Sequence, residues 1–495
     1  MLRILGSHKR FCDGLTRRDL LHIGALAPLG LTPPAWSPAA AANPAPTTTG
    51  GFGSAKRCVL LYLWGSPSQL DTFDPKPGAP AEVRGPLGSI PTSLPGVRVG
   101  EVLPRIAANL HRLTVVRSLG HQSPIHGAAF ALTGTPTTDL PLEGKVRDPR
   151  HWPFMGAVVD HLAARADPTP PPVPRNYWLP FPFGSKRGPS RSGPYGGFLG
   201  PAYDPVWAEF RATGTRSVTR DSGAPGSPTP LVADPYLGIR PTDRFDAGPA
   251  DDTLTLDRIH GRGSLLDQLD AARRAADAGP AAAAFDRHRA LARAVVTSGR
   301  LRDALDVQRE PARVRERYGM TLFGQSCLVA RRVLEAGGTF VTVCWDEYGL
   351  VNTGWDTHVH QTPRLKDELG PGFDAGLTAL LDDLEARGML ADTAVVVLSE
   401  HGRTPRVQNV AGAGRDHWAR AYSAAFAGAG FARGRVVGRT DKVGGDVTEV
   451  PVSPKDVVAT VCHVLGIGHG TEVHDRLGRP YPAAGPGQVR TELLG

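Results

Sequence analysis

Carboxylate and imidazole side chains recur in this sequence shortly after apolar runs. The clearest run is Thr393–Leu398, which stops at Ser399 before Glu400 and His401. The same pattern follows other apolar runs, and the further candidates are Asp71, His121, Ser123, His126, Asp356, His358, His360, Asp416 and His417. Buried polar groups are unfavourable unless a partner binds them. Carboxylates and neutral imidazoles bind zinc, manganese or calcium, so the pattern predicts a divalent-metal site.

Each candidate also has a purely structural interpretation. Asp356 and the histidines after it could hydrogen-bond their own loop, and Glu400 with His401 could cap a strand end. His417 beside Trp418 could be a packed surface histidine. Asp71 precedes a Pro-Lys-Pro segment, where aspartate is common in turns. The recurrence of these residue types after several strands favours the metal interpretation.

The elements that would position these residues alternate in type along the chain. Apolar runs bounded by turn residues predict strands at Arg57–Gly65, Leu113–Arg117, Gly338–Asp346 and Thr393–Leu398. Helical spacing predicts helices at Leu103–His111, His126–Gly134, Phe373–Gly388 and Pro454–Ile467, and a mostly helical region from Asp257 to Glu335. This alternation predicts an α/β fold with a mainly parallel sheet and helices on both faces. Ligands bind at the carboxyl ends of such strands, where the candidates would meet.

The N-terminal residues 1–42 have the parts of an export signal. The pair Arg17-Arg18 precedes an apolar stretch, Leu20–Leu31, and the small residues Ala39–Ala42 follow it. The pair after Thr16 resembles a twin-arginine signal, and an ordinary secretory signal is the alternative. Export to the periplasm or cell envelope is expected. The apolar stretch is short and broken by Gly and Pro, so no transmembrane span is expected in the mature chain.

After the signal, residues 43–55 are expected to form a flexible leader and residues 56–485 one domain. Residues 165–250 are rich in Pro, Gly, Arg and Asp and predict a long, loop-rich surface insertion that carries binding loops. The apolar share of 41% allows a large core. The net charge of +8 comes from scattered basic residues, which argues against a nucleic-acid partner. The cysteines after the signal are widely spaced in apolar settings and are expected in the core.

The order of the candidates resembles the metal-ligand order of the alkaline phosphatase superfamily. The matching pieces are Asp356 with His360, then Glu400-His401-Gly402, then His417. The segments QLDTFDPKP, YGMTLFGQSCLVARRVLEAG, WDTHVH, GRDHW and LGRPYP resemble DUF1501, a family of exported bacterial proteins in that superfamily. The resemblance spans nearly the whole mature chain. It implies an alkaline phosphatase-like three-layer sandwich with mainly parallel strands.

The same resemblance implies two metal sites. Asp356 and His417 would hold one metal together with His360, or with His358, which lies nearer the pattern of the family. Glu400 and His401 would hold a second metal, with Asp71 as a displaced substitute for the aspartate usual after the first strand.

The implied activity is metal-dependent hydrolysis of phosphate or sulfate esters. SPIHGAAFALTG resembles the sulfatase segment in which a Cys or Ser nucleophile begins a helix. Ser123 is the expected nucleophile, His126 stands where that segment has Arg, and Arg403 or Arg415 would neutralise the ester oxygens. Gln122 occupies the usual nucleophile position, which leaves an alternative open. In it, the chain is a non-catalytic envelope protein that binds a glycan or a partner protein through its insertion.

Overall fold

A computed structural model describes residues 50–123, 126–136, 139–221, 223, 226–227, 229–248 and 280–495. The predicted signal at 1–42, most of the predicted leader and the first part of the predicted helical region from Asp257 lie outside these residues.

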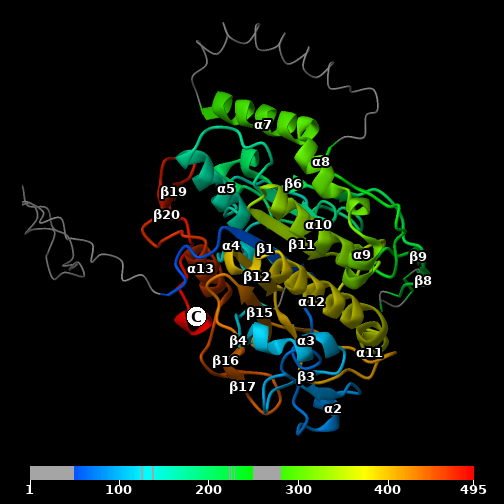
Figure 1. The fold of residues 1–495 in the computed structure, drawn as a ribbon. Helices are drawn as coiled ribbons and strands as arrows, with labels where there is room; N and C mark the ends of the chain where they lie inside the picture. The colour runs from blue at the N-terminus through cyan, green and yellow to red at the C-terminus, as the bar shows by residue number, and fades with distance from the viewer. Residues whose placement is uncertain are drawn as a thin grey trace, which may run out of the picture. The chain divides into compact units, whose positions relative to one another are not determined.

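The centre of the fold is an eight-stranded sheet with the strand order β16-β4-β15-β12-β1-β11-β5-β6 (Figure 1). Its strands are β1 (Arg57–Leu63), β4 (Thr114–Leu119), β5 (Asn176–Leu179), β6 (Val206–Trp207), β11 (Phe340–Trp345), β12 (Thr393–Leu398), β15 (Tyr422–Gly428) and β16 (Arg435–Val437). β15 pairs antiparallel with β12 and β4, and the other neighbours pair parallel. The predicted α/β fold with a mainly parallel sheet is confirmed.

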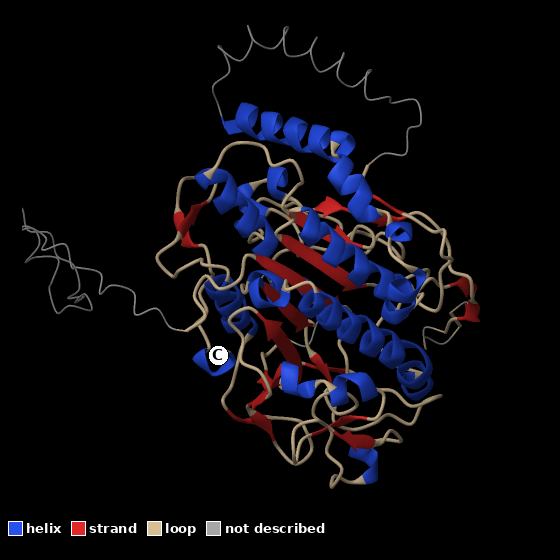
Figure 2. Cartoon of the chain, in the orientation of Figure 1, coloured by secondary structure: helices blue, strands red, loops and turns tan. Residues whose placement is uncertain are grey.

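Helices and short strands surround this sheet (Figure 2). The α-helices are α2 (Ala81–Arg84), α3 (Pro104–Ala108), α4 (Ala128–Thr133), α5 (Met155–Ala166), α7 (Pro280–Thr297), α8 (Gly299–Leu305), α9 (Ala312–Tyr318), α10 (Leu322–Ala336), α11 (Gln361–Arg364), α12 (Gly370–Ala386) and α13 (Pro454–Val464). A π-helical turn, η6 (Leu365–Leu369), joins α11 to α12. The small strands are β2 (Ser89–Pro91), β3 (Arg98–Gly100), β7 (Glu209–Phe210), β8 (Ser217–Thr219), β9 (Leu231–Ala233), β10 (Phe245–Asp246), β13 (Gly402–Arg403), β14 (His417–Trp418), β17 (Arg439–Thr440), β18 (Val447–Glu449), β19 (Glu472–His474) and β20 (Pro480–Pro482).

Strand β1 shows why the sheet needs helices on both faces. Val59 and Leu61 belong to one apolar core, which also contains residues of α10 and α12. Leu60 and Tyr62 belong to a second core, which contains residues of α4, α5 and α13. Because successive side chains of a strand point to opposite faces, an unbroken apolar run needs a core on each side. The fold therefore has a helical layer on each face of the sheet.

Local sequence signals set several of the element ends. β12 spans Thr393–Leu398, as predicted, and each end of β1, β4 and β11 lies within two residues of its predicted position. α4 ends at Gly134, which has φ +72° and closes the helix in the left-handed conformation. α13 begins with Pro454 after Ser453, whose side chain forms a capping box with Asp456.

The region 165–250 differs from its prediction as a loop-rich insertion. β5 and β6 lie within it and form one edge of the central sheet. β5 is the buried four-residue segment NYWL, and β6 has only two residues. Runs this short among Pro and Gly give no clear period-2 signal, which explains why the strands were missed.

Two further predictions from the sequence concern the cysteines and membrane-spanning helices. The four cysteines after the signal are buried, as predicted, and the structure shows them free: Cys58, Cys327, Cys344 and Cys462. Within the described ranges, no helix has the length and apolar character needed to cross a membrane.

Candidate metal centre

The candidate histidines come together beyond the carboxyl ends of the sheet strands. His401 follows β12, His126 follows β4, and Asp356 lies in the loop after β11. β13 and β14 pair antiparallel with Arg403 opposite His417, which brings the GRDHW segment back to the end of β12. Residues distant in sequence therefore meet at the edge of the sheet where the parallel fold predicts a ligand site.

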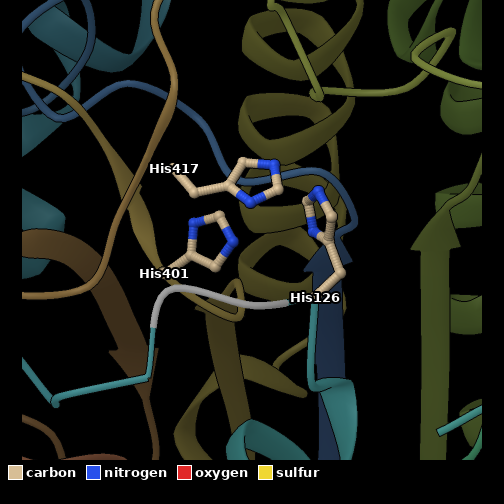
Figure 3. Close-up of side chains that lie close together, drawn as sticks. All are labelled: His126, His401 and His417. Atoms are coloured by element: carbon tan, nitrogen blue, oxygen red, sulfur yellow. The ribbon is translucent and has the colours of Figure 1, made fainter.

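His126, His401 and His417 form a compact group of three imidazoles, which we call the three-histidine group (Figure 3). Their ring centroids lie 4.9 Å apart for His126 and His401, 4.2 Å for His126 and His417, and 4.7 Å for His401 and His417. One potential ligand atom from each residue lies within 4.8 Å of the others. About a quarter of the His417 side chain (26%) is exposed, so the group is reachable from solvent.

His401 provides the test of whether this group fits a metal. Its Nδ1 lies 2.8 Å from the carbonyl oxygen of Gly402, which only accepts hydrogen bonds, so Nδ1 carries the proton and donates it. Nε2 then has a lone pair, is buried, and has no hydrogen-bond partner among the described residues. Burial, followed by the nearby positive charge of His126, holds the pKa of His401 well below its usual range. A neutral imidazole with a free, buried Nε2 is what a metal ion requires.

Glu400 fixes the orientation of the His126 ring through Nδ1, as the Gly402 carbonyl does for His401. Its Nδ1 lies 2.7 Å from Glu400 Oε1, and its Nε2 lies 3.1 Å from Asp356 Oδ2. Burial lowers the pKa of His126, but the contacts with Asp356 and Glu400 outweigh burial and raise the pKa to about 9. The Nε2 proton of His126 has to leave before this nitrogen can bind a metal, so metal binding should release protons.

Asp356, His358 and His417 form a second group, the aspartate group, which shares His417 with the first. His358 Nε2 lies 3.0 Å from Asp356 Oδ1 and 3.0 Å from His417 Nε2. His358 Nδ1 lies 2.8 Å from Asp416 Oδ1, which fixes the orientation of the ring. Burial raises the pKa of Asp356, but the adjacent Arg403 guanidinium and the histidines lower it more, to well below its usual range. Asp356 is therefore an ionised ligand candidate.

Glu400 lies next to the three-histidine group, and its carboxylate is already engaged. Oε1 accepts hydrogen bonds from the backbone N–H of Gly65 (2.8 Å) and from His126, and Oε2 accepts one from the Tyr62 hydroxyl (3.2 Å). His121 Nε2 lies 2.7 Å from the Glu400 carbonyl oxygen, so His121 also supports this strand end. The resemblance predicts Glu400 as a metal ligand, and the structure shows its carboxylate held by Gly65, Tyr62 and His126.

Four other predicted residues do not belong to either group. Asp71 is buried, and its Oδ2 accepts hydrogen bonds from Arg415 (2.8 Å) and Gln361 (2.8 Å). His360 is more exposed, and its Nε2 lies 3.6 Å from Asp221. Of the two histidines between which the sequence left the choice open, His358 belongs to the aspartate group and His360 does not.

Ser123 and Arg403 are the other two predicted residues that lie outside both groups. Ser123 donates its backbone N–H to His121 Nδ1 (3.2 Å), and within the described ranges its hydroxyl has no hydrogen bond to either group. Arg403 is fully buried, with an exposed fraction of 0%, and pairs with Asp356. Arg403 is thus enclosed in the interior, where its guanidinium does not reach a substrate in solvent.

Sequence reasoning missed the supporting residues Tyr62 and Gly65. Tyr62 lies inside an apolar strand, and a single tyrosine there does not interrupt the apolar pattern of the sequence. Gly65 has φ +99°, and a Cβ at this position would lie 2.2 Å from the backbone nitrogen of Asp356. A glycine directly after a buried strand is a usable signal of such a close approach.

A comparison with protein families matches residues 55–494 to the family described as "Protein of unknown function (DUF1501)". No curated protein matches the chain. Among solved structures, Ps i-CgsB is similar at 11% identity and a TM-score of 0.38, covering 83% of this chain and 72% of that one. Its complex with k-i-k-neocarrahexaose gives the same values. A structure marked BT33494S-sulf, described under metabolism of multiple glycosaminoglycans by Bacteroides thetaiotaomicron, has 12% identity, covers 84% of this chain and 73% of that one, and has a TM-score of 0.37.

TM-scores this low carry no argument about fold details, activity or substrate. The family comparison is different, because it extends over nearly all the described residues and agrees with the motifs found in the sequence. The chain belongs to the DUF1501 family, whose members are described as proteins of unknown function.

Proposed function

We propose that this protein is a metal-dependent hydrolase of phosphate or sulfate esters with an alkaline phosphatase-like fold. The observation that carries the proposal is the buried Nε2 of His401, which has no hydrogen-bond partner among the described residues and belongs to a group with two further imidazoles. A buried polar atom without a partner is unfavourable, and its retention calls for an explanation. A bound metal ion provides one.

The three-histidine group is the best candidate to hold the metal. His401 already presents its lone pair, and Glu400 fixes His126 so that Nε2 points away from the carboxylate that orients it. Zinc commonly binds three histidines and leaves a further position open, whereas manganese and calcium prefer more oxygen ligands. When bound, such a metal supplies Lewis-acid polarisation of an ester oxygen.

The charges around the centre favour an anionic substrate. His401 is neutral, and the negative charge of Asp356 is balanced by the buried Arg403. A divalent ion would therefore leave the local charge positive, which attracts a phosphate or sulfate group. An anionic ester or a charged envelope glycan is the substrate class that we propose.

Ser123 remains the proposed nucleophile. It lies between β4 and His126, in the same segment that brings His126 to the three-histidine group. The exposed Gln122 beside it, and the lack of a hydrogen bond from the Ser123 hydroxyl to the groups within the described chain, support the alternative of a non-catalytic binding protein. Turnover separates the two functions.

The location that we propose is the periplasm or cell envelope, reached by the twin-arginine route. The sequence signal at residues 1–42 supports this route. Folding before export would allow the centre to take up its metal in the cytoplasm.

The experiment that tests the function is a turnover assay on the mature chain without a His tag, from a twin-arginine-competent host. Aryl phosphate and aryl sulfate esters are supplied after chelation and again after readdition of zinc or manganese. We expect metal-dependent turnover that is lost in His401→Ala, falls sharply in Ser123→Ala, and is kept in His111→Ala, a change at an exposed histidine. A folded, metal-loaded parent that turns over no ester would contradict the hydrolase and favour the binding protein.

A further inference from the structure

We propose that Arg403 takes the place of a second cation, so that this centre binds one divalent metal ion and not two. The inference rests on the proposed function and makes its metal stoichiometry specific. Two overlapping ligand groups, and the superfamily resemblance, would otherwise suggest a pair of metals. The contacts of Arg403 argue against a pair.

Arg403 is a fixed internal cation. Its guanidinium pairs with Asp356 and donates hydrogen bonds to four backbone carbonyls, those of Gly65, Ser66 (3.0 Å), Arg415 (3.2 Å) and Trp355 (3.5 Å). An arginine side chain stays protonated in proteins. Because Arg403 is fully buried and anchored on several sides, its positive charge cannot move away when a metal binds.

Asp356 is the only carboxylate in the two groups, and Arg403 already neutralises it. Its Oδ1 accepts from Arg403 and also contacts His358 (3.0 Å) and His417 (3.3 Å). The other group members are histidines, which bring no negative charge when they bind metal. Two divalent ions this close repel each other strongly unless carboxylates offset their charge.

Two further carboxylates among the described residues, those of Glu400 and Asp416, lie beside the groups, but their oxygens are already held by other partners. Glu400 is taken up by Gly65, Tyr62 and His126. Asp416 holds His358 through one oxygen and accepts from Gln408 through the other. A first ion in the centre would therefore bind beside imidazoles and an Asp356–Arg403 pair whose charges cancel. A second ion would have to bind close to the Arg403 cation.

The single ion belongs in the three-histidine group. That group contains His401 and His126, and the buried Nε2 atoms of both have no hydrogen-bond partner among the described residues. In the aspartate group, Asp356 and His358 already satisfy each other and their neighbours Arg403 and Asp416. His417 belongs to both groups, and each of its ring nitrogens can bind only one metal ion at a time.

The test counts metal ions per chain and then locates them. The tag-free mature protein is loaded with zinc or with Co²⁺, dialysed, and measured by elemental mass spectrometry. We expect one ion per chain. Two tightly bound ions would overturn this inference while leaving the proposed function intact, and no bound ion in a folded parent would overturn both.

Variants then assign the ion to a group, with Co²⁺ affinity and the visible Co²⁺ spectrum as readouts that do not depend on turnover. We expect His401→Ala to weaken affinity by more than about 100-fold, and His358→Ala to weaken it by about tenfold, the low end of the effect of residues that contact metal ligands. His111→Ala should match the parent, and circular dichroism checks the fold of each variant. The reverse order of His401→Ala and His358→Ala would place the ion in the aspartate group and overturn the assignment.

Discussion

The imidazole of His401 is held through one nitrogen only. Nδ1 donates to the Gly402 carbonyl of its own strand end, and Nε2 faces the other histidines without a hydrogen bond to any described residue. His126 and His358 are each held by a carboxylate at Nδ1, from Glu400 and Asp416. At the residue scale, contacts at Nδ1 therefore fix the orientation of the rings of His126, His358 and His401. This shared arrangement is the strongest sign of a metal centre.

The role of Glu400 can be tested by Glu400→Gln. The amide keeps the shape of the side chain, but it replaces one acceptor oxygen with a donor facing the N–H groups of Gly65 and His126. We expect zinc affinity to fall by about 10- to 100-fold, measured by competition with a chromogenic chelator. Glu449→Gln, at an exposed glutamate, is the control. Unchanged affinity in Glu400→Gln would contradict the orienting role.

His161 predicts a pH dependence of stability away from the centre. It lies on α5 against the ring of Tyr203. Burial, with help from Arg165 and Arg287, lowers its pKa to about 4. The unfolded chain binds this proton near pH 6.5, so the contribution of His161 to stability is present above pH 6.5 and is lost as the pH falls towards 4.

Urea unfolding of the parent and His161→Phe between pH 7.5 and 4.5 measures this effect. The phenyl ring keeps a ring packed against Tyr203 and takes up no proton. We expect the free energy of unfolding to fall less steeply with acidification in the variant. Parallel curves for the two proteins would show that His161 is not the group responsible.

At the scale of elements, the end of β1 and the loop that carries Asp356 touch through their backbones. Gly65 permits this approach because it has no Cβ and adopts φ +99°. We expect Gly65→Ala to lower the free energy of unfolding by about 2 kcal/mol or more and to weaken metal binding, because the loop must shift. Gly78→Ala, where a Cβ would meet no atom within 4 Å, should stay within about 0.5 kcal/mol of the parent. Equal stabilities in urea unfolding would contradict the close approach.

The elements differ in how far the sequence predicts them. β12 is a six-residue apolar run bounded by polar residues, and its predicted bounds match. β5 and β6 are too short to show a period, and each needs a pairing edge: β5 pairs with β11, and β6 pairs with β5. Their pairing is a long-range contact that local sequence patterns do not contain. The short hairpin of β13 and β14 was missed for the same reason, although it carries His417.

At the scale of the whole molecule, the parallel sheet assembles the centre from segments far apart in the chain. The sequence predicted which residue types gather at the strand ends, and His126, Asp356, His358, His401 and His417 do meet there. It could not predict that Arg415 would take up Asp71 or that the Glu400 carboxylate would be fully engaged. Those outcomes depend on partners from distant parts of the chain, which one sequence does not specify.

Metal removal should weaken the whole fold, because the proposed ligands come from several strand ends. An ion that binds only the native state stabilises it by about 2.7 kcal/mol when its free concentration is 100 times Kd. We expect the chelated parent to melt at a lower temperature than the zinc-loaded parent in calorimetry. His401→Ala should melt at the same temperature with and without zinc. A parent indifferent to zinc and chelator would contradict metal binding by the native fold.

The central claim is that His126, His401 and His417 hold a metal ion, and anomalous diffraction tests it most directly. Crystals of the zinc-loaded, tag-free protein would be measured above and below the zinc absorption edge. The account predicts one strong anomalous peak within coordination distance of imidazole nitrogens from these three residues. A peak elsewhere, or no peak in crystals of protein that was loaded with zinc, would contradict it.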